Sequence, residues 1–153
     1  MDHVVELEIP ARPEFVGIAR MAVGALAGIR PGLAYERIDD LRIVVSEACT
    51  SAIEVLAPDD VLRLRCVDGP KLLEVRIEAP PEAFESAFPG GAADAAEAAE
   101  PTEGESFRIS LIRALVDDAE LRTAPGRTEL CLVLHREAGT DVDLDDDQTI
   151  GQG

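Results

Sequence analysis

Hydrophobic and polar residues alternate in four short stretches of the chain, which is the pattern of β-strands with one buried face. These stretches are residues 4–9, 61–67, 72–79 and 128–137. The first sets Val5, Leu7 and Ile9 against two glutamates. An Asp-Gly-Pro-Lys turn separates the second and third stretches and predicts a hairpin. We expect a further short strand near 120–123 to pair with the last one.

Apolar residues recur every three or four positions in three longer stretches, which predicts helices. The first covers residues 14–29 and stops at an Arg-Pro-Gly sequence; the second runs from about 34 to Pro58; the third covers 106–121. The order of these elements predicts an α+β fold. We expect a two-layer sandwich, with one mixed sheet of about five strands and three helices on one face.

Two stretches fit neither pattern and divide the chain into one domain, residues 1–136, and its appendages. Residues 80–105 are rich in Ala, Gly, Pro and Glu and are too long for a plain connector, so we expect a flexible lid-like loop, a functional flap or a solvated linker. Residues 137–153 are acidic and polar, which predicts a disordered tail.

The net charge of −17 gives information about possible binding partners rather than about the fold. Twelve of the acidic residues lie in 80–104 and 136–153, against a single Arg, so the remainder is only mildly acidic. Without a basic patch to neutralise phosphates, direct binding of nucleic acid is not expected. A basic protein partner is favoured.

Other composition features exclude further classes. No apolar run approaches the roughly 18 residues of a membrane span, and the first residues lack the pattern of a signal peptide, so we expect no membrane attachment and a cytoplasmic location. Cys49, Cys66 and Cys131 are scattered, which predicts buried thiols rather than a disulfide framework or a zinc site.

The stretch IVVSEACTSAIEVL, residues 43–56, carries the most distinctive candidate chemistry. It places Glu47 and Ser51 four residues apart, on one face of the predicted second helix. Glu47 is a candidate catalytic base or a polar residue at the margin of a buried helix. Ser51 is a candidate metal ligand or a small packing residue.

Three segments resemble the bacterial anti-sigma factor serine/threonine kinases of the GHKL, or histidine-kinase-like, ATPase superfamily. They are ELEIPARPEFVGIAR, YERIDDLRIVVSEACTSAIE and LVDDAEL with the closing strand. The resemblance covers about residues 4–136 and implies a Bergerat-type ATPase fold. It also implies ATP and Mg²⁺ as cofactors, and a sigma factor, an antagonist protein and a second copy of the chain as partners.

The first nucleotide motif of that family is E-x-x-x-N on a helix. Glu47 matches the glutamate, which the resemblance implies is the general base of phosphate transfer. The asparagine that holds Mg²⁺ is Ser51 here, a shorter side chain without a carbonyl oxygen. Ser51 is therefore the expected ligand to metal and cofactor.

The other two motifs are altered further. In the D-x-G-x-G motif that recognises adenine, Ala79 stands at the aspartate, and Glu78 is the nearest acid. At the glycine-rich phosphate loop the chain reads SFRI, with Ser106 and Arg108 in place of glycines. Arg108 is retained as a candidate phosphate ligand.

These features predict an anti-sigma regulatory factor that sequesters a sigma factor, is controlled by an antagonist, and binds ATP weakly or not at all. The alternative is an ATP- and Mg-dependent serine/threonine protein kinase that uses Glu47 as its base. Regulation of a different output remains a third alternative.

Overall fold

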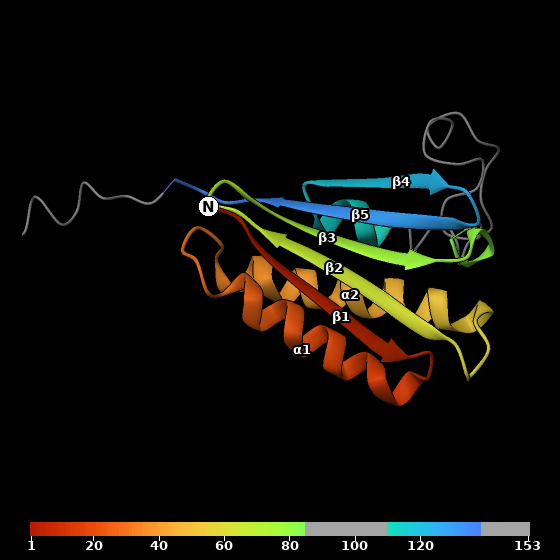
Figure 1. Cartoon of the computed structure of the whole chain (residues 1–153). Coiled ribbons are helices and arrows are strands. Elements are labelled where there is room, and N and C mark those ends of the chain that lie inside the picture. The colour runs from red at the N-terminus through yellow and green to blue at the C-terminus, as the bar shows by residue number, and fades with distance from the viewer. Residues whose placement is uncertain (85–109, 139–153) are drawn as a thin grey trace, which may run out of the picture.

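The computed structural model describes residues 1–84 and 110–138. In this part of the chain, a β-sheet is covered on one face by helices (Figure 1). The strands are β1 (His3–Pro10), β2 (Val61–Asp68), β3 (Leu72–Ala79), β4 (Asp118–Ala124) and β5 (Arg127–His135). Their spatial order is β1-β2-β3-β5-β4. The α+β class and the five-stranded sheet are confirmed.

Every strand pairing in the described part of the chain is antiparallel, so the prediction of a mixed sheet was wrong. The reason lies in the connection between β1 and β2. Two helices in succession return the chain to the end of the sheet where β1 finished, and β2 must then run back beside β1. β3 and β4 do run in the same direction, but β5 separates them.

The helices follow the predicted order with shorter bounds. After a 3₁₀ turn, η1 (Pro13–Phe15), come α1 (Val16–Ala27) and α2 (Tyr35–Val55), which lie against each other along the sheet (Figure 1). The helices approach closely at Gly24, where an added Cβ would displace the guanidinium end of Arg42 of α2.

The third predicted helix is seen over residues 110–115 and ends earlier than expected. Its Ile112 is buried in the core, and Arg37 of α2 donates to the Leu115 carbonyl, so it lies on the same face as α1 and α2. Asp118 already belongs to β4, where Ala119 and Leu121 alternate toward the core. The alternation of buried and exposed residues in β4 therefore replaces the helix that we had predicted to continue to residue 121.

The core lies between the helices and the sheet and consists mainly of Val, Leu, Ile and Ala. Cys49, Cys66 and Cys131 are buried free thiols, as predicted. In the described residues, no helix is both long and apolar enough to cross a membrane. β1 begins and β5 finishes at the same end of the sheet, so the two ends of the folded part lie close together (Figure 1).

Candidate functional site

The C-terminal half of α2 carries the residues singled out in the sequence. Glu47 is half-buried, and Ser51, one helical turn further on, is buried with 6% of its surface exposed. This segment forms a helix because Val44, Val45, Ala48 and Ala52 form its core-facing side. Glu47 therefore lies at the margin of the helix layer, where a ligand can approach it, whereas Ser51 lies deeper.

The chain after β3 folds back onto α2 and closes this region on one side. Pro80 precedes a 3₁₀ turn, η2 (Pro81–Ala83), and Phe84 behind it is fully buried. Proline fixes the backbone and offers no N–H group, so the turn is stiff and presents few donors. The buried Phe84 anchors the start of the stretch for which we predicted a lid-like loop. The remainder of that loop lies outside the described residues, as does the acidic tail.

Ala79, which the sequence analysis assigns to the aspartate of the family motif, points toward the helices and is 4% exposed. Its cross-strand partner is Thr128 of β5, which is 2% exposed and on the same side of the sheet. A methyl group therefore replaces the carboxylate, and Thr128 adds a buried hydroxyl beside it. The sequence analysis missed Thr128, although strand pairing of 79 with 128 would have indicated it.

Glu78 lies on the opposite face of the sheet. Its carboxylate pairs with Arg127 at 3.4 Å, and it lines an open hollow of about 580 Å³ with Glu8, Arg63 and other charged residues. The structure does not bring Glu78 together with Glu47 and Ser51, because neighbouring residues on a strand point to opposite faces. Arg108, the other expected cofactor ligand, lies outside the described residues.

A second surface was not recognised in the sequence. The outward side of α1 and the turn that follows it carry an apolar stripe, which we define as Ile18, Met21 and Ala25 of the helix and Ile29 of the turn. Met21 is 69% exposed and Ile29 67% exposed, and Tyr35 beside them is 86% exposed. The buried residues of α1 are Val16, Ala19, Val23, Gly24, Leu26 and Ala27, and they face the core and α2.

Comparison of the chain with known proteins identifies its family. Residues 9–134 match the histidine kinase-like ATPase domain. The serine-protein kinase RsbW of Oceanobacillus iheyensis is 31% identical over 150 residues, covering 94% of this chain and 93% of that protein. The chain belongs to the histidine kinase-like ATPase family. The resemblance to serine kinases of the RsbW type is thereby confirmed.

Two further relatives of this histidine kinase-like ATPase are informative. The RsbW of Bacillus subtilis is 45% identical over 56 residues, which cover 37% of this chain and 34% of that protein. A solved structure of the RsbU and RsbW domains of a Mycobacterium tuberculosis protein matches 89% of this chain with a TM-score of 0.60 and 17% identity. The match spans 34% of that longer chain and supports the fold.

The described residues of this histidine kinase-like ATPase fit Mg-ATP poorly. At the two positions that the sequence analysis assigns to adenine and metal, Ala79 has a buried methyl group in place of a carboxylate, and the buried Ser51 has a short hydroxyl in place of a longer amide. Within residues 1–84 and 110–138, no three His, Cys, Asp or Glu side chains gather to hold a metal ion.

Proposed function

We propose that this protein is an anti-sigma regulatory factor, which binds a sigma factor in the cytoplasm and releases it when an antagonist protein binds instead. Membership of the family and the RsbW relatives support this proposal. The observation that carries it is the apolar stripe of α1. A surface helix that is apolar on its outward side as well as its inward side is typical of a protein-binding surface.

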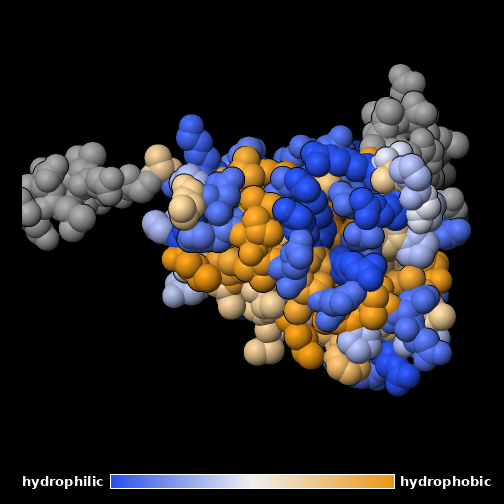
Figure 2. All heavy atoms as spheres, in the orientation of Figure 1, coloured by the Kyte–Doolittle hydropathy of each residue, from blue (hydrophilic) through white to orange (hydrophobic). Residues whose placement is uncertain are grey.

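The stripe has the properties of a docking site for a protein. Its exposed residues recur every three or four positions, so they form one continuous face. Figure 2 shows apolar side chains gathered along the side of the molecule where α1 and β1 lie. A hollow of about 290 Å³ between α1 and α2 adjoins the stripe and is lined by Gly24, Gly28, Tyr35 and others. It is suited to receive an apolar side chain of the partner.

The acidic charge of the chain supports a partner with a basic surface. The net charge of −17 creates a negative field that favours association with basic proteins, and sigma factors must carry basic surfaces to bind DNA. We include a homodimer in the proposal as a property expected of the family.

In this proposal ATP binds weakly or not at all. Two observations support this part of the proposal: Ala79, the residue assigned to adenine recognition from the sequence, is a buried methyl group, and two prolines stiffen the segment that follows it. Stable partner binding then rests on the protein surface and does not require nucleotide chemistry.

The second candidate function is a serine/threonine protein kinase. Glu47 favours it, since this carboxylate is only half-buried at the margin of α2, where a general base would stand. The names of the RsbW relatives, which are serine-protein kinases, favour it as well.

Co-purification with each sigma factor of the same genome, at micromolar concentration, tests the first candidate. We expect one stable complex, and Met21→Asp should weaken it at least about tenfold by placing a charge in the docking face. Val61→Asp is the matched control, because Val61 is also exposed but lies on β2. Absence of a complex with every sigma factor would contradict the proposal.

Calorimetry with ATP and Mg²⁺ separates the two candidates. We expect a dissociation constant weaker than roughly 1 mM, equivalent to about −4 kcal/mol. Tight binding, together with phosphate transfer that disappears in Glu47→Ala while the sigma complex survives, would establish the kinase.

A further inference from the structure

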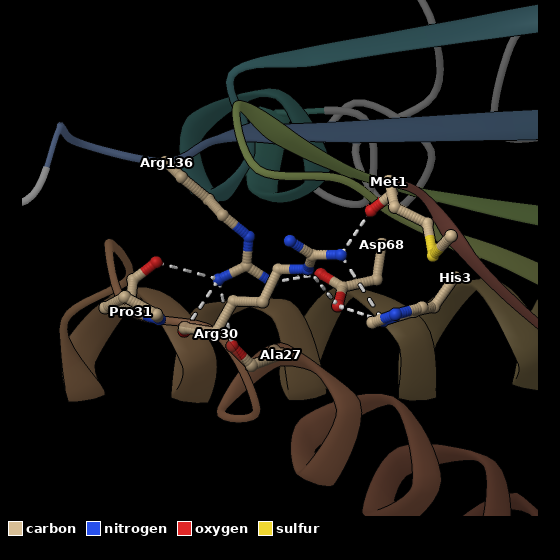
Figure 3. Close-up of polar contacts among 7 residues, drawn as sticks. All are labelled: Met1, His3, Ala27, Arg30, Pro31, Asp68 and Arg136. Atoms are coloured by element: carbon tan, nitrogen blue, oxygen red, sulfur yellow. Dashed lines mark hydrogen bonds and ion pairs between the residues drawn. The ribbon is translucent and has the colours of Figure 1, made fainter.

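A cluster of charged residues is buried at the end of the sheet where β1 begins. Asp68, the last residue of β2, is fully buried, and its carboxylate accepts from Arg136 at 2.5 Å and from Arg30 at 3.0 Å. We call Asp68, Arg30 and Arg136 the Asp68 cluster (Figure 3). Arg30 also donates to the Met1 carbonyl and approaches His3. Three segments far apart in the sequence are therefore joined through one carboxylate.

Arg136 contributes more than a charge to this cluster. Its Nη1 donates to the carbonyls of Ala27 at 3.2 Å, Arg30 at 3.0 Å and Pro31 at 3.4 Å. Ala27 is the last residue of α1, and the final carbonyls of a helix have no partners within the helix. The Arg136 side chain, 1% exposed, therefore caps the C-terminal end of α1 while its other nitrogen holds Asp68.

Backbone hydrogen bonds also hold the turn after α1 in place. The Arg136 N–H donates to the Lys71 carbonyl at 2.8 Å, and the Glu137 N–H donates to Gly32 at 2.9 Å. Gly32 has φ = 105°, and a Cβ there would meet the Glu137 oxygen at 2.8 Å. The turn after α1 is thus held between the β2–β3 hairpin and the residues that follow β5.

We propose that Arg136 is a positioning residue for the partner-binding face of α1. It holds the C-terminal end of α1 and the following turn at one place on the sheet, so that Ile29 and Tyr35 are presented to a partner in a fixed arrangement. The inference rests on the proposed function for the identity of the partner, but not for the effect of Arg136 on α1. The guanidinium is suited to this role because its planar fork reaches Asp68 and the helix carbonyls at once, which the point charge of a lysine cannot do.

Hydrogen exchange of the α1 end tests the positioning without any partner. Gly28 and Ile29 donate to carbonyls of the last turn of α1, so their exchange reports on its order. We expect Arg136→Lys and Arg136→Gln to speed exchange of these two amides at least about tenfold relative to amides of β3. The control is Val75→Ala, which lowers overall stability from the middle of β3 and should leave that ratio unchanged.

Arg136→Lys is the decisive variant because it keeps the positive charge beside Asp68 but loses the fork. If Arg136→Gln does not fold, the lysine variant alone carries the test. An exchange ratio within about twofold of the wild type in Arg136→Lys would overturn the proposal, because the ion pair alone would then order the helix end.

Affinity for the sigma factor captured by the wild type is the second measurement. We expect Arg136→Lys to weaken binding about tenfold, since a partner must then order the helix end itself. Faster exchange with unchanged affinity would overturn the positioning role. A wild type that captures no sigma factor would refute the proposed function, and the exchange experiment would still decide what Arg136 does to α1.

Discussion

The two ends of the sheet differ in the kind of side chain that is buried there. At the end where β1 begins, Asp68 and Arg136 are buried, charged and bonded to several partners. At the end where β3 finishes, the buried groups on the helix side are mostly apolar, namely Ala79, Ala83 and Phe84, and the buried Thr128 is polar but uncharged. About 16 residues of α2, roughly 24 Å at 1.5 Å per residue, separate its start near the Asp68 cluster from Ser51.

The difference shows where the fold is vulnerable. A buried charge that loses its partner is strongly destabilising, whereas an apolar cluster tolerates changes that keep its volume. Among the described residues, the end where β3 finishes therefore relies mainly on apolar packing, which tolerates volume-conserving substitutions. We expect the Asp68 cluster to tolerate substitution less well, because each change there leaves a buried charge short of a partner.

The strongest test of this comparison is Arg136→Ala. Removal of the guanidinium leaves the Asp68 carboxylate with a single cationic partner and uncaps α1, so we expect a loss of roughly 3–5 kcal/mol in the free energy of unfolding. Urea denaturation measures it. A loss below about 1 kcal/mol would show that the cluster contributes no more than a surface ion pair.

Gly32→Ala probes the same end through the backbone. The substitution adds strain at φ = 105° and a contact of 2.8 Å with the Glu137 oxygen, and we expect a cost of roughly 3 kcal/mol. Gly126→Ala is a matched control, because Gly126 also has a positive φ of 76° but no neighbour within 4 Å of the added Cβ. It should cost only about 1 kcal/mol. Equal costs in thermal unfolding would mean that the close approach of residue 137 is unimportant.

Ala79→Asp examines the opposite end by returning a carboxylate to the adenine position. An acid buried without a partner should cost roughly 2 kcal/mol, whereas Glu78→Ala on the exposed face should cost less than about 1 kcal/mol. Unfolding with and without Mg-ATP measures both quantities. Recovery of the lost stability by Mg-ATP would contradict the comparison, since it would show that the rest of the nucleotide site is intact.

The buried thiols of the core provide a reference in which ionisable groups are buried without an ion pair. Burial raises the pKa of Cys49 to about 12 and that of Cys66 to about 11, from 9.0. The folded protein keeps protons that the unfolded chain releases, so this contribution is complete below pH 9 and is lost as the pH rises toward 11 or 12. We expect stability to fall by about 1 kcal/mol per pH unit per thiol in that window. Urea titrations at several pH values give the free energy of unfolding as a function of pH. Cys49→Ala should make this free energy fall less steeply with pH than in the wild type. An unchanged fall would rule out Cys49 as a source of the pH dependence.

The smallest effect is expected for the ion pairs of the open sheet face. Arg65 pairs with Glu6 at 3.0 Å, with both side chains largely exposed. Arg65→Gln should therefore change stability by less than about 0.5 kcal/mol, the value typical of such pairs in water. If Arg65→Gln lowered the free energy of unfolding as much as Arg136→Ala under the same conditions, buried and exposed ion pairs would contribute equally. That result would contradict the comparison of the two ends.

The order of the elements could be predicted from local patterns, because alternation and helical spacing depend on neighbours in sequence. The predicted strands over 4–9 and 72–79 agree with β1 and β3 to within one or two residues. Antiparallel pairing throughout the described sheet was not predicted, because strand direction depends on how the connections return. The site residues are only partly brought together: Glu47 and Ser51 share α2, whereas Glu78 faces away.

The Asp68 cluster could not be predicted. Asp68 fits an ordinary turn signal before Gly69, and Arg136 looks like the first charge of an acidic tail. Their contact spans 68 positions, and no local pattern indicates a partner at such a distance. The stripe on α1 was missed for a related reason: a helix that is apolar on both sides gives the same spacing whether its outward side is covered or exposed.

The position of Met1 has a practical consequence. A domain or affinity tag joined before Met1 would emerge beside Arg30 and the turn that follows α1, because Arg30 donates to the Met1 carbonyl. This place lies at the opposite end of α2 from Ser51. A bulky attachment there would therefore crowd a protein docked near Ile29 before it disturbed the region around Glu47. Because β1 begins at the end of the sheet where β5 finishes, a chain shortened to residues 1–138 and closed by a short linker, with new ends at the exposed turn around Gly126, is a sensible circular permutation.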